Sequence, residues 1–517
     1  MIKNFKWLLL VSLTFVACTS DDDAVIDPNS SDGLPLTAGS ADFSKYVALG
    51  NSLTAGYSDN ALFIAGQEGS YPNLLSQRFA MVGGGEFKIP YMNDNVGGLL
   101  LGGFQIQGPR LYFNGSGPAP VPGTTTTEIT NFLTGAYNNM GIPGAKSFHL
   151  LAPGYGNVAG IVTGQSNPYF VRFATSPSTT VLADATVQNP TFFSLWIGNN
   201  DVLAYATSGG TGVNQSGNLD PSTYSGNDIT DPNVFANVYS TLVTQLTAGG
   251  AKGVVANIPY VTSVPFFTTV PTNPIPGLPA ASAGQLNQLF GGINLALAGA
   301  GLPPRFQTLV ANDGNPATVE ANPLLIKDES LPNISAQITA ALTPVLGAPT
   351  AGYLGLLYGQ ARHASNVTAT KDYILLTART IIGTTQAGAP SPFNTVGVSY
   401  PMQDNTTLTA TETAEVKAAT DAFNASIASL ASSKGLAFVD ANAILVQVSN
   451  GGLAVNGYTM TSTYVTGNSF SLDGVHPSPK GYALIANKFL EAINAKYGSN
   501  LKGVNLGQYQ ILFPAVL

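Results

Sequence analysis

Short apolar runs alternate along the chain with longer stretches in which apolar residues recur at helical spacing. Continuous apolar runs of roughly four to eight residues are typical of strands that are buried on both faces. Four such runs are clear, and the run at 138–142 is weaker; in chain order they are 46–50, 138–142, 191–197, 253–258 and 436–440. Strands that alternate with helices favour a mostly parallel sheet flanked by helices.

Three segments have the pattern of amphipathic helices. They are 233–247, 410–434 and 479–497, and each places apolar residues at every third or fourth position. Thr409 and Glu412 form a predicted capping box at the start of the second segment, because each side chain can accept from the backbone of the other. We therefore expect three core helices in these places.

Two regions do not fit a compact α/β core. Residues 98–136 are rich in Gly, Pro and Thr, and the pattern predicts a long loop. Residues 264–408 carry many prolines, with patchy helical signals near 284–297 and 331–346. We interpret 264–408 as one large insertion, or cap, that covers the active-site end of the sheet.

The N-terminus has the proportions of a signal peptide. Lys3 and Lys6 precede an apolar run at 7–16, which is too short to span a bilayer as a helix. Cys18 follows directly and is the only cysteine in the chain. The residues before it resemble a bacterial lipobox, so we expect 1–18 to be a lipoprotein signal with acylation at Cys18. The alternative is a cleaved signal with an incidental cysteine.

Residues 19–40 are polar, acidic and without apolar periodicity, which predicts a flexible tether between the anchor and the fold. The acidic run at 21–23 resembles a sorting signal of surface lipoproteins, although a solvated tail would have the same composition. We expect an exported lipoprotein that Cys18 anchors in the outer membrane, exposed at the surface.

Composition excludes several classes of partner. The net charge is −8, and Lys and Arg nowhere form the clusters that bind a phosphate backbone, so we expect no nucleic acid. No second apolar run reaches the length of a membrane span. Because there is no cysteine pair, an exported chain of this size relies on its core rather than on disulfides.

Histidine is scarce, and one of the three lies in a turn that suits catalysis. His476 follows Asp473 in Asp-Gly-Val-His-Pro, just before a predicted helix. At this spacing the carboxylate can accept from Nδ1–H, which leaves Nε2 free to act as a base. His149 and His363 have no carboxylate within four residues, and we expect structural roles for both.

Three polar segments follow predicted strands, where ligands of open α/β sheets bind. Ser52 lies just past the first strand in Gly-Asn-Ser-Leu-Thr. Asn200 lies in Gly-Asn-Asn-Asp after the strand at 191–197, and its amide could donate to an oxyanion. Gly144 ends a glycine-containing segment after the weak strand, where a backbone N–H could approach the same oxygen.

These segments, in this order, resemble the four sequence blocks of the SGNH, or GDSL-type, serine hydrolases. The resemblance implies that residues 41–517 form a hydrolase domain, a three-layer α/β/α sandwich with a flavodoxin-like sheet and the insertion. It implies Ser52 as the nucleophile and His476 with Asp473 as the activating pair. The oxyanion donors would be the Ser52 N–H, Gly144 and Asn200. The family usually has Asp where this chain has Asn51, a residue that orders the turn.

The expected activity is hydrolysis of carboxylic esters, of lipids or of short acyl groups, through an acyl-enzyme on Ser52. A carbohydrate O-acetyl esterase and a non-catalytic surface binding protein with a decayed site are the alternatives. We expect no cofactor, since no glycine-rich nucleotide motif follows the first strand, and no zinc site. Asp220, Asp228 and Asp231 could bind calcium, but a solvated loop has the same composition.

Overall fold

The computed structural model describes residues 27–315 and 317–517. At its centre is a five-stranded sheet in which every pairing is parallel. Its strands, in chain order, are β1 (Tyr46–Gly50), β6 (Asn139–Gly141), β7 (Phe192–Trp196), β8 (Lys252–Ala256) and β13 (Ala437–Val439). All five lie within the runs predicted as strands or one residue outside them, so the α/β prediction is confirmed.

The order of the strands in the sheet is β13-β8-β7-β1-β6. When the five are numbered along the chain, this is 2-1-3-4-5, the order of flavodoxin-like sheets. The connections after β1 and β7 leave in opposite directions across the sheet, so the carboxyl ends of these two neighbours border a crevice. In open α/β sheets ligands bind at such a switch point.

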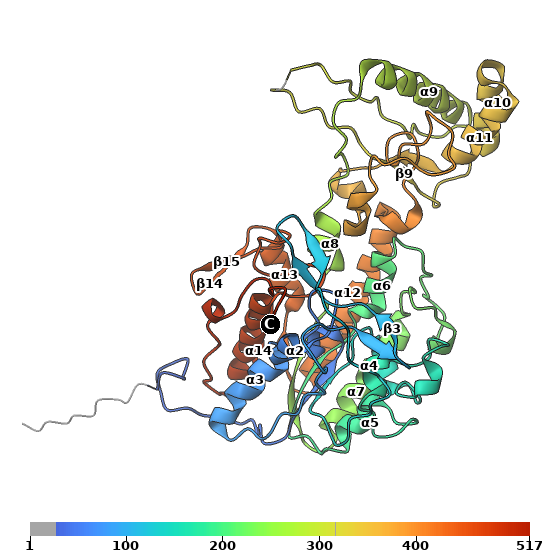
Figure 1. Ribbon diagram of the computed structural model, residues 1–517. Helices are drawn as coiled ribbons and strands as arrows, with labels where there is room; N and C mark the ends of the chain where they lie inside the picture. The colour runs from blue at the N-terminus through green and yellow to red at the C-terminus, as the bar shows by residue number, and fades with distance from the viewer. Residues whose placement is uncertain (1–26, 316) are drawn as a thin grey trace, which may run out of the picture.

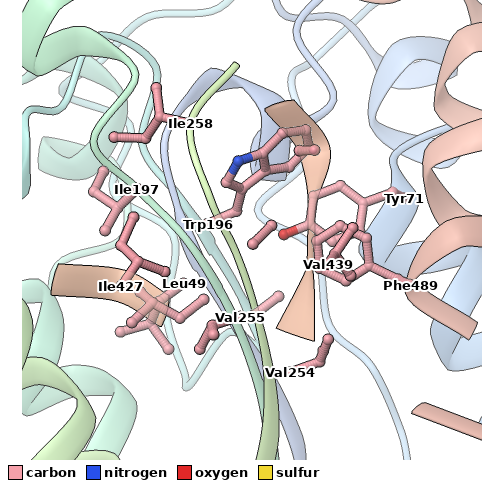
Figure 2. Packing of buried hydrophobic residues seen from close by; sticks show 14 of the residues in the cluster. Leu49, Tyr71, Trp196, Ile197, Val254, Val255, Ile258, Ile427, Val439 and Phe489 are labelled. Atoms are coloured by element: carbon pink, nitrogen blue, oxygen red, sulfur yellow. The ribbon is translucent and has the colours of Figure 1, made fainter. Parts of the chain in front are cut away.

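Helices cover both faces of this sheet. On one face lie α3 (Tyr71–Phe79) and α14 (Pro479–Tyr497), from which Tyr71 and Phe489 point towards each other (Figure 2). Their ring centroids are 4.6 Å apart. On the other face lie α7 (Pro232–Thr247) and α12 (Ala410–Ser433), which contributes Ile427. Because both faces are covered, β1 and β7 are buried along their whole length, which explains their continuous apolar sequence.

The predicted helices α7, α12 and α14 are confirmed, and their ends are where the capping residues place them. Thr409 and Glu412 form the predicted capping box of α12. Ser478 caps α14 by accepting from the N–H of Gly481. Shorter elements complete the body: α1 (Ser52–Ala55), α2 (Ile64–Glu68), α4 (Pro168–Val171), α5 (Val181–Thr186), α6 (Asn200–Thr207), α13 (Ala441–Ser449), β14 (Leu453–Val455) and β15 (Tyr458–Met460).

The segment 98–136, predicted as a loop, contains two small antiparallel hairpins. One pairs β2 (Leu99–Leu101) with β3 (Phe104–Gln107), and the other pairs β4 (Leu111–Phe113) with β5 (Pro118–Pro120). Gly102 and Gly103 form the first turn with φ of 59° and 81°, a conformation that glycine adopts readily. The prediction was wrong here because the strands are short and lie among many turn residues.

A second lobe projects from the body at the top of Figure 1. It begins at α8 (Pro265–Thr268) and ends at β12 (Thr407–Leu408), and it therefore corresponds to the predicted insertion at 264–408. Its helices are α9 (Ala280–Gly299), α10 (Ser335–Leu346) and α11 (Ala348–Tyr358), and its strand pairs are β9 (Leu325–Lys327) with β10 (Ala361–His363) and β11 (Tyr373–Ile374) with β12. Two apolar clusters of its own, around Phe290 and Ile326, are separate from the main core.

The N-terminal residues that the structure describes are packed, in contrast to the flexible tether predicted for 19–40. The N–H of Ser31 donates to Asn500 O and that of Ser40 to Tyr497 O, both at 2.8 Å, while Thr37 N–H donates to Asn500 Oδ1. Residues 27–40 are therefore held against the C-terminal end of α14. The predicted signal at 1–18, Cys18 and residues 19–26 lie outside the described residues. No helix within the described ranges is long and apolar enough to cross a bilayer.

Candidate active site

Ser52 lies at the carboxyl end of β1, as the first residue of α1. The preceding Asn51 caps this helix, since its Oδ1 accepts from the N–H of Leu53 at 3.0 Å. Gly50 permits the close approach to β7, because a Cβ here would lie 2.4 Å from the carbonyl oxygen of Trp196. The tight turn holds the Ser52 side chain in the crevice between β1 and β7, with only 6% of the residue exposed.

The structure brings His476 and Asp473 to Ser52 across more than 400 residues of sequence. His476 Nε2 lies 2.9 Å from Ser52 Oγ, and His476 Nδ1 lies 2.9 Å from Asp473 Oδ2. A carboxylate can only accept from Nδ1–H, which leaves the Nε2 lone pair directed at the serine hydroxyl. Each ring nitrogen thus has the partner that a serine nucleophile with a histidine base requires.

The turn before α14 holds the Asp473 carboxylate as an anion. Its Oδ1 accepts from the N–H groups of Val475 and His476, both at 2.8 Å, and its Oδ2 also accepts from Asn60 N–H at 3.0 Å. Burial alone would raise the pKa of Asp473, but the charge of His476 and these hydrogen bonds outweigh it and lower the pKa to about 2. Asp473 therefore stays ionised and fixes the orientation of the imidazole.

The predicted oxyanion donors lie in the turns that follow β1, β6 and β7. Asn200 begins α6, and its Nδ2 donates to Ala145 O at 2.9 Å, which ties the amide to the loop after β6. On the other side of that loop, Asn167 Nδ2 donates to Pro143 O at 2.8 Å. Gly144 lies between these two contacts with a φ of 82°, which favours glycine.

Two backbone N–H groups in the turns after β1 and β6 have no acceptor among the hydrogen bonds of residues 27–315 and 317–517. They belong to Gly144 and to Ser52, the latter at the unpaired N-terminal turn of α1. Asn200 has a second amide hydrogen besides the one that it donates to Ala145. These three donors can serve an anionic oxygen without breaking an existing hydrogen bond.

Asn51 makes a contact that depends on its amide. Its Nδ2 donates to Asn199 Oδ1 at 3.0 Å, while its Oδ1 caps α1. An aspartate could make the second contact but could not donate in the first. The asparagine therefore links the turn after β1 to the turn after β7, which carries Asn200.

The sequence analysis did not identify Asp59, which is hydrogen-bonded to the turn that carries Asp473 and His476. Asp59 Oδ1 accepts from Leu472 N–H at 2.9 Å, and Asp59 N–H donates to Ser471 Oγ. Burial raises the pKa of Asp59 to about 7, helped by the nearby Asp473 charge and opposed by the bond from Leu472. Asp59 and Asn60 both have positive φ, which Asp and Asn adopt more readily than most residues. The adjacent polar residues 58–60 were the available signal.

The other two histidines have structural contacts, and neither is hydrogen-bonded to Ser52. His149 Nδ1 accepts from Lys146 N–H, and His363 Nδ1 accepts from Gln307 N–H in the projecting lobe. Burial lowers the pKa of each to about 4, so both imidazoles are neutral at neutral pH. The structure therefore supports His476 as the base.

An apolar cavity of about 130 Å³ adjoins Ser52 and His476. Ser52, His476 and Asn200 line it, and α13 and α14 contribute more of the other lining residues than any other element. Because Ser52 lines it, a molecule that reacts with Ser52 lies beside this cavity.

Carboxylates elsewhere in the described ranges have structural explanations. Glu329, Asp404 and Glu412 are the one group of three whose oxygens lie close enough to share an ion. Burial raises the pKa of Asp404 to about 7 and that of Glu412 to about 8. Protonation of these two carboxyl groups near neutral pH therefore removes the charge repulsion within the group. Asp228 and Asp231, considered as calcium ligands, accept hydrogen bonds from backbone N–H groups, and Asp231 caps α7.

The arrangement has the parts that acyl transfer to a serine requires: a hydroxyl 2.9 Å from an imidazole nitrogen, an ionised carboxylate on the other ring nitrogen, and donors without acceptors in the neighbouring turns. Comparison of the chain with models of protein families, with curated proteins and with solved structures finds no match.

Proposed function

We propose that the protein is a serine hydrolase of the SGNH type that cleaves carboxylic esters through an acyl-enzyme on Ser52. The observation that carries this proposal is the chain of two 2.9 Å contacts from Ser52 Oγ to His476 and from His476 to Asp473. The sheet order supports it too, because Ser52 and Asn200 follow the carboxyl ends of two neighbouring strands, β1 and β7, at the switch point.

In the first half of the reaction, His476 Nε2 takes the proton from Ser52 Oγ as the oxygen attacks the ester carbonyl carbon. The carbonyl oxygen becomes an oxyanion, which the N–H groups of Ser52, Gly144 and Asn200 stabilise. Asp473 stabilises the imidazolium and keeps its own negative charge. The C–O bond then breaks, and His476 returns the proton to the departing alcohol, which leaves the acyl group on Ser52.

In the second half, a water molecule takes the place of the alcohol. His476 removes its proton as the water oxygen attacks the acyl carbon, the same donors hold the second oxyanion, and the proton returns to Ser52 Oγ. The products are one carboxylic acid and one alcohol, and no cofactor is required. A sugar O-acetyl ester would follow the same steps, so substrate profiling has to separate the two substrate classes.

The reactivity of Ser52 tests the proposal directly. A labelled fluorophosphonate should react with the wild-type protein and not with Ser52→Ala, and labelling should be very slow in His476→Ala. If the folded wild type does not react, the site is a binding site with a decayed catalytic apparatus.

Kinetics of the same variants test the assigned roles. Ser52→Ala and His476→Ala should each lower kcat on a soluble ester by about 10⁶, and the double variant should be hardly worse than either. Asp473→Asn should lower kcat by about 10⁴, because it only orients the imidazole. A folded His476→Ala that keeps more than about a tenth of kcat would transfer the role of base to another group.

The protein is further proposed to be a lipoprotein that is acylated at Cys18, the only cysteine in the sequence. Cys18→Ala should abolish incorporation of radiolabelled palmitate and move the protein from the membrane pellet to the soluble fraction. The esterase activity of Cys18→Ala should be unchanged, which separates anchoring from catalysis. Unchanged palmitate incorporation would refute the anchor.

A further inference from the structure

The cavity beside Ser52 has the walls of a hydrocarbon pocket. On one side α13 contributes Ile444, Leu445 and Val448, and on the other α14 contributes Leu484 and Ile485. At the sheet, Trp196 and Val439 line it. α14 starts three residues after His476, and side chains of both helices line the same cavity as Ser52 and His476.

Polar groups are scarce along these walls, apart from the catalytic end. Lys488 is the one lining residue with a permanent charge among those that the structure describes, and its Nζ pairs with Glu491 at 2.7 Å. A sugar ring in this cavity would lose the hydrogen bonds that its hydroxyls make to water, and the walls offer few replacements. An alkyl chain makes no hydrogen bonds to water that it could lose on entering the cavity, and it gains contact with the aliphatic side chains.

We propose that this cavity binds the acyl chain of the substrate and that the preferred substrates are esters of linear acids with about six to ten carbons. The length follows from the helices, since Gly481 and Lys488 line the cavity seven residues apart on α14, or about 10 Å. An extended alkyl chain rises roughly 1.3 Å per bond, from C–C bonds of about 1.5 Å, so about eight bonds fill this length. This inference rests on the proposed esterase function.

The volume agrees with a chain of this size. A dry protein cavity of about 150 Å³ holds benzene, which has six carbons. The cavity here is about 130 Å³, and Ile444 and Ile485 on its walls are only half-buried, so a chain of a few more carbons can extend past them. A palmitoyl chain would project into solvent and gain little from its outer half.

The order of the reaction assigns the cavity to the acyl group rather than to the alcohol. The alcohol leaves first, and water must then reach the acyl carbon from the place that the alcohol occupied. An alcohol held between α13 and α14 would have to leave past the newly acylated Ser52, and water would enter through an apolar channel. An acyl chain in the same place stays bound until deacylation and leaves the solvent side open.

Chain length is the first test. Each buried methylene raises kcat/KM by up to about fourfold. On p-nitrophenyl esters of the wild-type protein, kcat/KM should rise at least about 30-fold from acetate to octanoate and should not rise further towards palmitate. The kcat/KM values for octyl acetate and ethyl acetate should differ by much less than about 30-fold, because the acyl groups of these two esters are identical.

Filling the cavity is the second test. Ile444→Trp and Ile485→Trp each place a large ring in the proposed path of the chain, so the preference for octanoate over acetate should fall at least tenfold. Val446→Trp is the matched control: it lies on α13, is also half-buried and does not line the cavity, so its chain-length profile should equal that of the wild type. Thermal unfolding of each variant checks the fold.

Direct binding is the third test, and it does not need activity. Trp7 and Trp196 are the two tryptophans of the chain, so in the full chain with Trp7→Phe and Ser52→Ala only Trp196, on the cavity wall, fluoresces. Its Nε1 donates to Asn257 O at 3.0 Å, so its indole is held in place. Sodium octanoate should change the fluorescence saturably, and sodium acetate should not.

The outcomes separate this inference from the proposed function. If the wild type hydrolyses no ester and does not react with a fluorophosphonate, the function itself fails. If it hydrolyses esters with no dependence on acyl length, the function stands and the acyl pocket is refuted. If instead octyl acetate is strongly preferred to ethyl acetate, the cavity takes the alcohol, which also overturns the inference.

Discussion

Among single residues, Asn200 combines a structural bond with an unused donor. Its Nδ2 donates to Ala145 O, which fixes the plane of the amide, and the second hydrogen is left for an oxyanion. A donor that is held by the protein before the reaction starts needs no reorganisation when charge develops, which is why such groups are effective. The same bond sets the position of the Gly144 loop.

Asn200→Ala should therefore lower kcat by about 10²–10³ with little change in KM, the usual loss for one oxyanion donor. Asn200→Asp has the same shape but cannot donate, so its loss should be at least as large. Both variants should keep the circular dichroism spectrum of the wild type. A decrease in kcat of less than about threefold would place Asn200 outside the oxyanion hole.

Asp59 should make stability fall as the pH rises from about 4 to about 7. In this interval the carboxyl is ionised in the unfolded chain but still protonated in the native state, where its pKa is about 7. The native state then binds more protons, so the free energy of unfolding decreases with pH, by up to about 4 kcal/mol for a three-unit shift of a buried group. Above pH 7 both states are ionised, and the contribution is constant.

Asp59→Asn keeps an oxygen for Leu472 N–H but cannot ionise. Urea unfolding at pH 5 and pH 8 should show a smaller loss of stability for Asp59→Asn than for the wild type. Equal losses in the two proteins would mean that Asp59 titrates normally in the folded state. Asp404 and Glu412 also have raised pKa values, but they contribute equally to both proteins and cancel in the comparison.

At the level of secondary structure, the sequence was sufficient where local signals coincide. α12 has a capping box, an apolar face and Gly435 just after its end, and its bounds were predicted to within one residue. The strands of the sheet are buried on both faces and are therefore apolar throughout. Ser52, Asn200 and His476 each follow or precede one of these elements, so their shared location at one edge of the sheet was predictable.

What the sequence did not predict depends on distant contacts or on weak local signals. Asp59 supports the catalytic turn from 413 residues away in the chain, and no local pattern indicates such a pair. The hairpins β2–β3 and β4–β5 have strands of three or four residues, too short for periodicity to be recognised. Residues 27–40 resemble a disordered tail by composition, but their backbone groups pair with the C-terminal segment.

For the molecule as a whole, the separate cores of the body and the projecting lobe predict separate unfolding. Phe290 is 1% exposed and stacks on Phe306 inside the lobe, with ring centroids 4.9 Å apart. Phe290→Ala should destabilise the lobe by about 3–5 kcal/mol, because it leaves a cavity in a small core. Hydrolysis of p-nitrophenyl acetate should stay within about twofold of the wild type at 25 °C.

Hydrogen exchange measured by segment checks this prediction. In Phe290→Ala the amides of α9, α10 and α11 should exchange faster while those of β1 and β7 stay protected. Phe423→Ala is the matched control, since Phe423 is fully buried in the body and stacks on Phe235; there the body should lose protection. Faster exchange throughout Phe290→Ala would show that the two parts unfold as one cooperative unit.

The attachment of residues 31–40 to the end of α14 determines at which end an anchored molecule would be tethered. His476 lies three residues before the first residue of this helix, and Ser40 is bonded at its other end, 19 residues or about 28 Å away. Cys18 is nine residues from Asp27, a reach of at most about 30 Å. An acylated Cys18 would thus tether the protein by the pole opposite the active site, with a tether about as long as α14 itself.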